Sequence, residues 1–301
     1  MTRKIMKIWK SKPTIEGAGV HLKRAFGYSQ IPQLDPFLLL DDFHSDIPDN
    51  YLSGFPWHPH RGIETITYVL HGTVEHGDSM GNRGLISPGD VQWMTAGNGI
   101  IHQEMPKGGK DDLLWGFQLW ANLPAKVKMM DPRYREVKSS QIPEKKLASG
   151  AAVKVICGAV DGTSGPVRDI VTAPEYLDVS VPAGTTFTHG VLSGHTAFVY
   201  VVEGSAYFDE ERNAFSREVI GSNYFDFKRD CKGGPEALIL YGHEGDQIAV
   251  TTEDSAVRFL LISGRPIREP IAWYGPIVMN TQEELQIAFE EYEKGTFIKH
   301  R

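Results

Sequence analysis

The chain has 301 residues, of which 41% are hydrophobic, 10% aromatic and 23% charged, a mix that suits one or two hydrophobic cores and excludes a disordered or fibrous chain. The 31 basic and 38 acidic residues give a net charge of −7, which argues against direct nucleic-acid binding. No apolar run approaches the ~18 residues of a membrane span, no secretory signal is apparent, and the two cysteines, Cys157 and Cys231, form no CxxC pair, so we expect a cytoplasmic protein.

Short runs rich in β-branched and aromatic residues recur along the chain between glycines and prolines. Such strands, with turn signals at regular spacing, predict an all-β sandwich or barrel architecture. The clearest runs cover residues 63–70, 153–156, 176–181, 197–202, 237–241 and 257–262.

Two histidine-containing stretches in the first half predict a metal site. His58 and His60 are two residues apart, as are His102 and Glu104, so in extended strands each pair projects from one face. A lone His-x-His pair is common in exposed turns, but two such pairs on neighbouring strands of a small barrel can converge on one ion. Three imidazoles and one carboxylate suit Fe, Mn, Ni, Cu or Zn. Glu64 shares the parity and is expected to orient a ligating imidazole rather than bind the metal.

The proline-rich polar stretch 121–144 suggests a boundary between two domains. We therefore expect an N-terminal metal-binding domain over 1–130 and a C-terminal domain over 131–301. The two halves share a pattern of turn residues. In each, a strand ends in glycine (Gly72 or Gly204) and a Gly-Asp pair follows later, at 89–90 or 245–246. This order is typical of a jelly-roll barrel and indicates an internal repeat.

Counting from these landmarks gives the second-half counterparts of the four metal-site residues. Gly190 and Leu192 fall at the places of His58 and His60, and Arg258 and Leu260 at those of His102 and Glu104. The expectation is that the C-terminal domain has lost the metal site, although a slip of one residue would bring His189 into register.

One helix is expected near the C-terminus. Thr281 and Glu284 form a capping-box pattern and Gly295 stands where the helix would stop. The apolar stripe between them consists of Leu285, Ala288, Phe289 and Tyr292.

The segments that contain the two histidine-containing pairs, together with several neighbouring segments, resemble the pirin family of bicupins. The resemblance is carried by 58–62, 64–65, 78–82, 89–97, 102–106, 122–126 and 131–134. It implies two cupin barrels, double-stranded β-helix or jelly-roll domains, with a metal only in the first. It also implies that His58, His60, His102 and Glu104 are the ligands, in agreement with the parity argument.

The resemblance further implies function. Family members are described as iron-containing and as opening the flavonol quercetin with dioxygen, so we expect a quercetin 2,3-dioxygenase-type enzyme with one divalent ion, Fe(II) by preference, with Zn, Mn, Ni, Cu or Co as alternatives. Glu104 is either a ligand only or also the general base that takes the flavonol proton. Phe55, Trp57, Trp93 and Met94 flank the ligand strands, and half of them are expected to line an aromatic-binding mouth.

Two other functions stay open at this stage. The first is a non-catalytic, metal-dependent regulatory protein that binds a transcription factor or a metabolic enzyme, which would allow a nuclear location in a eukaryote. The second is a zinc-dependent sugar isomerase, which is disfavoured because few basic residues lie near the ligands. The expected partners are a small flavonol-like aromatic and O2, with a protein partner left open and neither nucleic acid nor membrane. A bicupin supplies its own barrel–barrel interface, so a monomer is expected.

Overall fold

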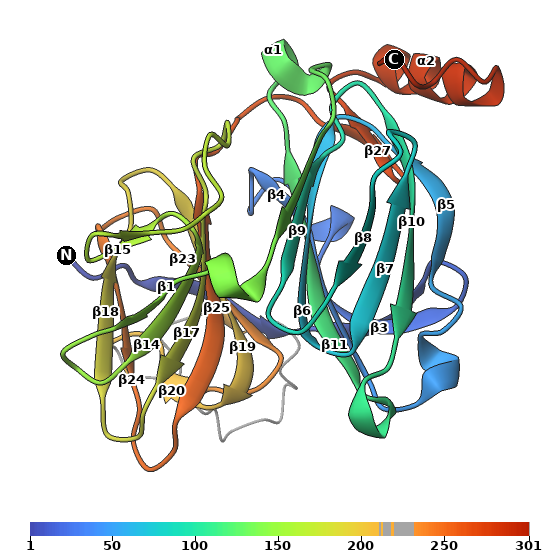
Figure 1. The fold of residues 1–301 in the computed structure, drawn as a ribbon. Coiled ribbons are helices and arrows are strands. Elements are labelled where there is room, and N and C mark those ends of the chain that lie inside the picture. The colour runs from blue at the N-terminus through green and yellow to red at the C-terminus, as the bar shows by residue number, and fades with distance from the viewer. Residues whose placement is uncertain (211, 213–217, 220–231, 301) are drawn as a thin grey trace. The chain divides into compact units, whose positions relative to one another are not determined.

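The fold is known from a computed structural model that describes residues 1–210, 212, 218–219 and 232–300. The described chain is predominantly β-structure and divides into two compact units, each coloured along the chain in Figure 1. Unit A contains residues 12–139 and 267–301, and unit B contains residues 1–11 and 140–266. The N-terminal residues 1–11 therefore belong to the unit formed mainly by the second half of the chain, and the C-terminal residues 267–301 belong to the unit formed by the first half. The expected division into 1–130 and 131–301 does not include these two terminal segments in this way.

Unit A is built from two antiparallel sheets and a short hairpin. The larger sheet has the order β12 (Arg133–Val137), β9 (Val91–Thr95), β6 (Ile63–His71), β11 (Leu114–Asn122), β4 (Phe37–Ser45), β3 (Val20–Phe26) and β2 (Lys12–Glu16). The smaller sheet has the order β5 (Phe55–His60), β10 (Ile100–Lys107), β7 (Thr73–Asp78) and β8 (Arg83–Ile86). The hairpin pairs β26 (Ala272–Tyr274) with β27 (Ile277–Met279).

Helices are few in unit A. The longer one, α2 (Gln282–Glu293), begins with the expected capping box, since Glu284 N donates to Thr281 Oγ1 and the Glu284 carboxylate accepts from Thr281 N. Leu285 and Ala288 are its buried residues, and Gly295 follows its end with a φ of 68°. The shorter helix is α1 (Ala125–Lys128). Unit A also contains the 3-10 turns η1 (Tyr28–Gln30), η2 (Pro48–Asn50) and η3 (Lys110–Asp112), and η4 (Ser139–Gln141) begins at its residue 139 and continues into unit B.

Unit B repeats the two-sheet plan. Its larger sheet has the order β13 (Glu144–Lys146), β14 (Ala152–Cys157), β17 (Glu175–Val181), β25 (Val257–Gly264), β19 (Thr196–Gly204), β23 (Ala237–Tyr241), β1 (Ile5–Lys10) and β21 (Glu218–Val219). Its smaller sheet has the order β18 (Thr186–Gly190), β24 (Gln247–Thr251), β20 (Ala206–Tyr207) and β22 (Lys232–Gly233), and β15 (Ala159–Val160) pairs with β16 (Thr163–Ser164). All six expected strand runs are therefore confirmed.

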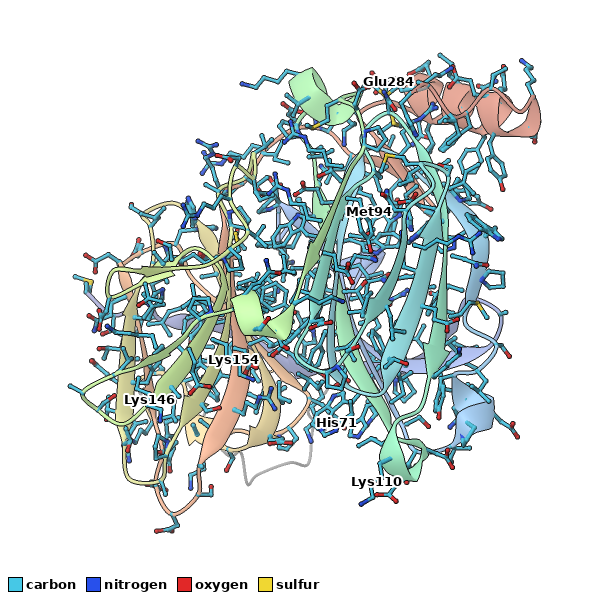
Figure 2. The ribbon with its side chains drawn as sticks, in the orientation of Figure 1. His71, Met94, Lys110, Lys146, Lys154 and Glu284 are labelled. Carbon is cyan, nitrogen blue, oxygen red and sulfur yellow. The ribbon has the colours of Figure 1, made fainter. Side chains whose placement is uncertain are left out.

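The cores follow strand alternation, which sends every second side chain inward. In unit B the inward residues of β17, Leu177 and Val179, join a large aliphatic cluster. In unit A, Met94, labelled in Figure 2, is fully buried with Ile63 and Ile100. Cys157 is buried with Sγ 3.2 Å from the Pro174 carbonyl oxygen, and Cys231 lies outside the described residues. No helix among the described residues is both long and apolar enough to span a membrane.

Candidate metal centre

His58 and His60 lie on β5, at the edge of the smaller sheet of unit A. The neighbouring strand β10 pairs with β5 so that His102 stands opposite His58. Nε2 of His58 and Nε2 of His60 are 3.1 Å apart. Two nitrogens bound ~2.1 Å from one ion, at an angle of roughly 90–110°, lie roughly 3.0–3.4 Å apart, so the observed spacing fits two ligands of one metal.

The backbone fixes which nitrogen of each ring is free to bind an ion. Nδ1 of His58 lies 2.8 Å from the Pro56 carbonyl oxygen, and Nδ1 of His60 lies 3.0 Å from that of Pro276. A carbonyl oxygen only accepts, so each Nδ1 carries the ring proton and each neutral ring presents a lone pair at Nε2. The 3.1 Å contact is therefore between two lone pairs rather than a hydrogen bond. A cation shared by the two nitrogens would make this arrangement favourable.

His102 completes a cluster of three imidazoles. Its side chain is fully buried, and neither of its ring nitrogens has a hydrogen-bond partner. Its ring centroid lies 4.4 Å from that of His58 and 4.9 Å from that of His60, and one nitrogen from each of the three rings falls within 4.8 Å of the others. A buried polar group without a partner is costly, and a bound metal ion would satisfy it.

Burial keeps these three rings neutral, the form that binds metal. Burial lowers the pKa of His58, and the neighbouring His76 adds to the effect against the opposing pull of the Pro56 carbonyl and Glu104. Burial together with the other imidazoles holds the pKa of His60 and of His102 well below the usual range. The donor set thus fits a transition ion in chemistry and in spacing.

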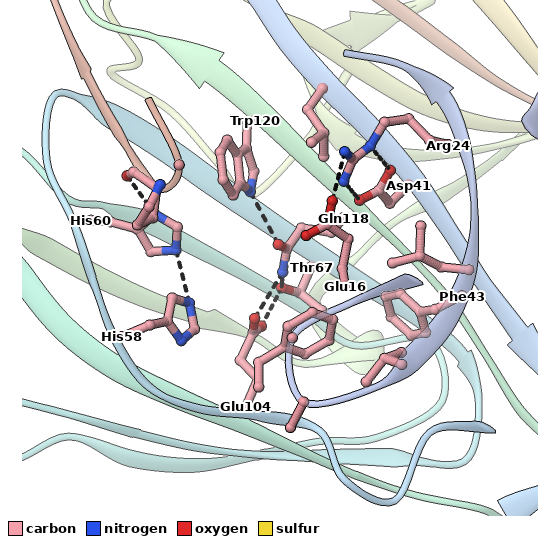
Figure 3. Close-up of a pocket in the computed structure, with 18 of the residues that line it drawn as sticks. Glu16, Arg24, Asp41, Phe43, His58, His60, Thr67, Glu104, Gln118 and Trp120 are labelled. Carbon is pink, nitrogen blue, oxygen red and sulfur yellow. Dashed lines mark hydrogen bonds and ion pairs between the residues drawn. The ribbon is translucent and has the colours of Figure 1, made fainter. Parts of the chain in front are cut away.

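Glu104, the fourth expected ligand, lies beside the cluster but outside the group of converging imidazole nitrogens. Thr67 Oγ1 donates to its Oε1 at 2.9 Å, and Gln118 Nε2 donates to its Oε2 at 2.8 Å. Trp120 Nε1 in turn donates to Gln118 Oε1 at 3.0 Å, as Figure 3 shows. The carboxylate is therefore held by neutral donors from β6 and β11.

The residue expected to orient a ligating imidazole does not do so. Glu64 is buried, but its Oε1 accepts from Thr95 Oγ1 at 2.7 Å. The partner of His60 is the Pro276 carbonyl from the β26–β27 hairpin, far away in the sequence. Sequence parity could place Glu64 on the correct strand but could not identify a backbone carbonyl contributed by a distant turn.

A pocket of about 810 Å³ opens beside the histidines, and all of its lining residues belong to unit A. This volume lies within the range of pockets for drug-sized ligands. His58, His60 and Glu104 contribute to its wall. Most of the remaining wall is apolar, formed by Val20, Leu22, Leu39, Phe43, Phe55, Val74 and Leu114.

Of the four aromatic or methionine residues considered for the mouth, one lines this pocket. Phe55 does so, whereas Trp57 is 52% exposed and Trp93 and Met94 are buried in the core. The other Phe, Tyr and Trp rings in the wall come from Phe43, Trp120, Trp273, Tyr28 and Tyr274. Trp120 follows Gln118 by two residues on β11, so the same parity rule would have found it once that strand was placed.

The structure corrects the sequence alignment of the two halves. Gly89-Asp90 precedes β9 in the larger sheet of unit A, but Gly245-Asp246 precedes β24 in the smaller sheet of unit B. Arg258 and Leu260 therefore lie on β25, whose neighbours β17 and β19 match those of β11 rather than β10. The strands of unit B that match β5 and β10 are β18 and β24, whose inward residues are Phe187, His189, Ile248 and Val250.

His189 is thus the one inward histidine of that strand pair, as a one-residue slip would allow. Its Nε2 lies 3.2 Å from Glu175 Oε1, and Ser263 Oγ donates to the other carboxylate oxygen at 2.9 Å. Phe187, Ile248 and Val250 belong to the apolar core of unit B.

Comparison with known proteins agrees with this architecture. The Pirin family model matches residues 19–121, and the model for the pirin C-terminal cupin domain matches residues 176–298. A pirin-like protein of Caulobacter vibrioides is 41% identical over 297 residues, covering 98% of this chain and 99% of that protein. The chain belongs to the pirin family. Its fold is accordingly two cupin domains with a C-terminal helix.

Two further relatives of this pirin-family chain have names that indicate an activity. A Pseudomonas aeruginosa protein named "Putative quercetin 2,3-dioxygenase" is 40% identical over 297 residues, covering 97% of each chain. The crystal structure of quercetin 2,3-dioxygenase from Acinetobacter baumannii superposes with a TM-score of 0.85 at 30% identity, covering 99% of each chain.

Proposed function

We propose that the pocket of unit A is the active site of a metal-dependent dioxygenase of the quercetin 2,3-dioxygenase type, which opens a flavonol ring with O2. The proposal rests on one observation: a cluster of metal-binding histidines lies beside a cavity large enough for an aromatic substrate. His58 and His60 present Nε2 lone pairs beside an apolar pocket of about 810 Å³. The names of two relatives support the same reaction.

In this proposal His58, His60, His102 and Glu104 hold one divalent ion, with Fe(II) preferred. A redox-capable ion bound there supplies the electron exchange between the flavonol and O2. The buried His60 and His102 and the partly buried His58 would hold the ion beside the pocket. The apolar walls bind the flat aromatic body of the substrate and exclude water from it.

Glu104 is proposed to have a second role, as the acceptor of the flavonol hydroxyl proton. Its carboxylate lines the pocket and is oriented by Thr67 and Gln118, which donate to separate oxygens. Glu104→Gln tests this role because it preserves the side chain's shape and removes its basicity. We expect retained metal with turnover reduced by roughly 100-fold or more, as for loss of a general base. Unchanged turnover would dismiss the base role.

Gln118→Ala tests the positioning of that carboxylate. It removes the 2.8 Å hydrogen bond to Glu104 without touching a histidine. We expect wild-type metal content, lower turnover, and partial recovery of turnover in Gln118→Asn. A merely structural role would lower stability and leave the rate of the folded protein unchanged.

The activity itself is tested by mixing iron-loaded protein with quercetin in air and following flavonol absorbance together with O2 uptake. We expect one O2 consumed per flavonol lost, and no reaction in His102→Ala. His21→Ala is the matched control, because His21 is an exposed residue of β3 in the same unit. Absence of turnover at full iron occupancy would contradict the enzyme and favour a metal-dependent regulatory protein.

A further inference from the structure

A row of polar side chains crosses the floor of the unit A pocket. Cross-strand register places Thr67 on β6 opposite Gln118 on β11, Gln118 opposite Asp41 on β4, and Asp41 opposite Arg24 on β3. All four residues line the pocket. The row therefore runs perpendicular to the strands, from the Glu104 carboxylate at one end to Arg24 at the other.

The length of this row follows from the strand pairing. Neighbouring strands lie about 4.8 Å apart, so two strand spacings, roughly 10 Å, separate the backbone at Thr67 from that at Asp41. Figure 3 shows the histidine pair and the Arg24–Asp41 pair on opposite sides of the pocket, with Gln118 between them. The pocket thus has two polar ends, separated by the length of a small polycyclic aromatic molecule.

The distal end combines one cation with two carboxylates. Arg24 Nε and one terminal nitrogen donate to the two oxygens of Asp41, both at 2.8 Å. The other terminal nitrogen lies 2.8 Å from Glu16 Oε1. The Asp41 side chain is 8% exposed and that of Glu16 is 41% exposed. Arg24 is therefore neutralised, and the cluster carries an excess of negative charge when both acids are ionised.

We propose that Glu16, Arg24 and Asp41 form a subsite that binds phenolic hydroxyl groups at the end of the substrate remote from the histidines. This inference rests on the proposed function and names its substrate class, a neutral flat aromatic that carries hydroxyls at its far end. Glu16 and Asp41 both line the pocket, and ionised carboxylate oxygens only accept hydrogen bonds, so the two side chains match hydroxyl donors. The same excess of acid disfavours a ligand with a carboxylate or phosphate at that end.

Burial raises the pKa of Asp41 to about 6, against the opposing hydrogen bonds and charge of Arg24. At pH 7.5 Asp41 is therefore ionised and accepts hydrogen bonds, so binding is best measured there. The charged groups around it in the pocket are Arg24 and Glu16.

The test compares two flavonols that differ only in the hydroxyls of the pendant ring, quercetin with two and galangin with none. Binding to iron-loaded protein is followed without O2 by quenching of tryptophan fluorescence, since Trp120 and Trp273 line the pocket. In the wild type we expect quercetin to bind at least roughly tenfold more tightly, as for a hydrogen bond to an ionised group.

Glu16→Gln and Asp41→Asn should each bring the ratio of the two dissociation constants toward one. Glu16→Gln leaves the Arg24–Asp41 pair intact, so this variant still tests the subsite if Asp41→Asn fails to fold. The matched control is Glu75→Gln, which removes an exposed carboxylate paired with Lys107 on the smaller sheet, and it should keep the wild-type ratio.

The proposal is overturned if the two flavonols bind wild type equally, if neither binds, or if the ratio survives in Glu16→Gln and in folded Asp41→Asn. Failure of the proposed function has a different signature. A ratio that depends on Glu16, without O2 uptake by the iron-loaded protein in air, would support the subsite and contradict the dioxygenase.

Discussion

The backbone carbonyl oxygen of Pro276 lies 3.0 Å from Nδ1 of His60, although 216 residues separate the two in the sequence. The carbonyl accepts a hydrogen bond from the protonated Nδ1, which leaves Nε2 of His60 unprotonated and directed at His58. Pro276 lies in the turn between β26 and β27, so the C-terminal segment of the chain orients one of the proposed metal ligands.

The residue after His60 makes a second connection to the same segment. Arg61 is 1% exposed and donates to Glu291 Oε2 of α2, and to the carbonyl oxygens of Phe297 and Asn98, each at 2.8 Å. Glu291→Gln leaves this buried guanidinium without its carboxylate. We expect the free energy of unfolding to fall by about 1–3 kcal/mol, measured by urea denaturation. Glu290→Gln, next to it on α2 and paired with the exposed Lys294, is the control and should change stability little. Equal effects of the two substitutions would contradict the role given to Arg61.

The turn after His60 requires a glycine. Gly62 has a φ of 81°, and a Cβ there would overlap the carbonyl oxygen of Val278. Gly81 has a similar φ of 85°, but a Cβ there would meet no atom within 4 Å. Gly81→Ala therefore measures the cost of backbone strain alone, whereas Gly62→Ala adds the overlap with Val278. We expect Gly81→Ala to cost about 1–2 kcal/mol and Gly62→Ala at least about 2 kcal/mol more. The measurement is urea denaturation together with metal content, which should fall only in Gly62→Ala. Equal costs would show that the contact with Val278 is unimportant.

Asp41 gives a pH dependence of stability. Burial raises its folded-state pKa to about 6 from the usual 3.8. The native state therefore takes up the proton first as the pH falls, so Asp41 adds stability below pH ~4 that is lost as the pH rises through 6. We expect the unfolding free energy of wild type minus that of Asp41→Asn to decrease by roughly 3 kcal/mol at most between pH 4 and pH 7. Denaturation of the metal-free proteins at several pH values measures it, and a difference that does not change with pH would contradict the shift.

Local sequence rules predicted the elements that depend on near neighbours. Alternation along strands placed His58 and His60 on one face and paired His102 with them, and the capping pattern located α2. The Gly-Asp landmarks misled because the same dipeptide opens a strand of the larger sheet in unit A and of the smaller sheet in unit B. A turn glycine reports a backbone conformation and not the sheet that the next strand joins.

The parts of the site that sequence reasoning missed depend on contacts between distant segments. The Pro276 carbonyl lies in a turn, and Arg24 and Asp41 lie on two paired strands. Their positions in the site depend on how these segments pack together in the fold, which local sequence patterns do not reveal. Gln118 and Trp120 carry the correct alternation on β11, but alternation alone does not say which face of a strand meets a pocket.

The central claim is that His58, His60 and His102 hold one transition ion, and metal stoichiometry tests it most directly. Elemental analysis of protein loaded with Fe(II) and then desalted should give one ion per chain in wild type and in His21→Ala. His58→Ala, His60→Ala and His102→Ala should each retain close to none. Wild-type protein that binds no transition ion, or a His102→Ala protein that keeps a full complement, would contradict the account.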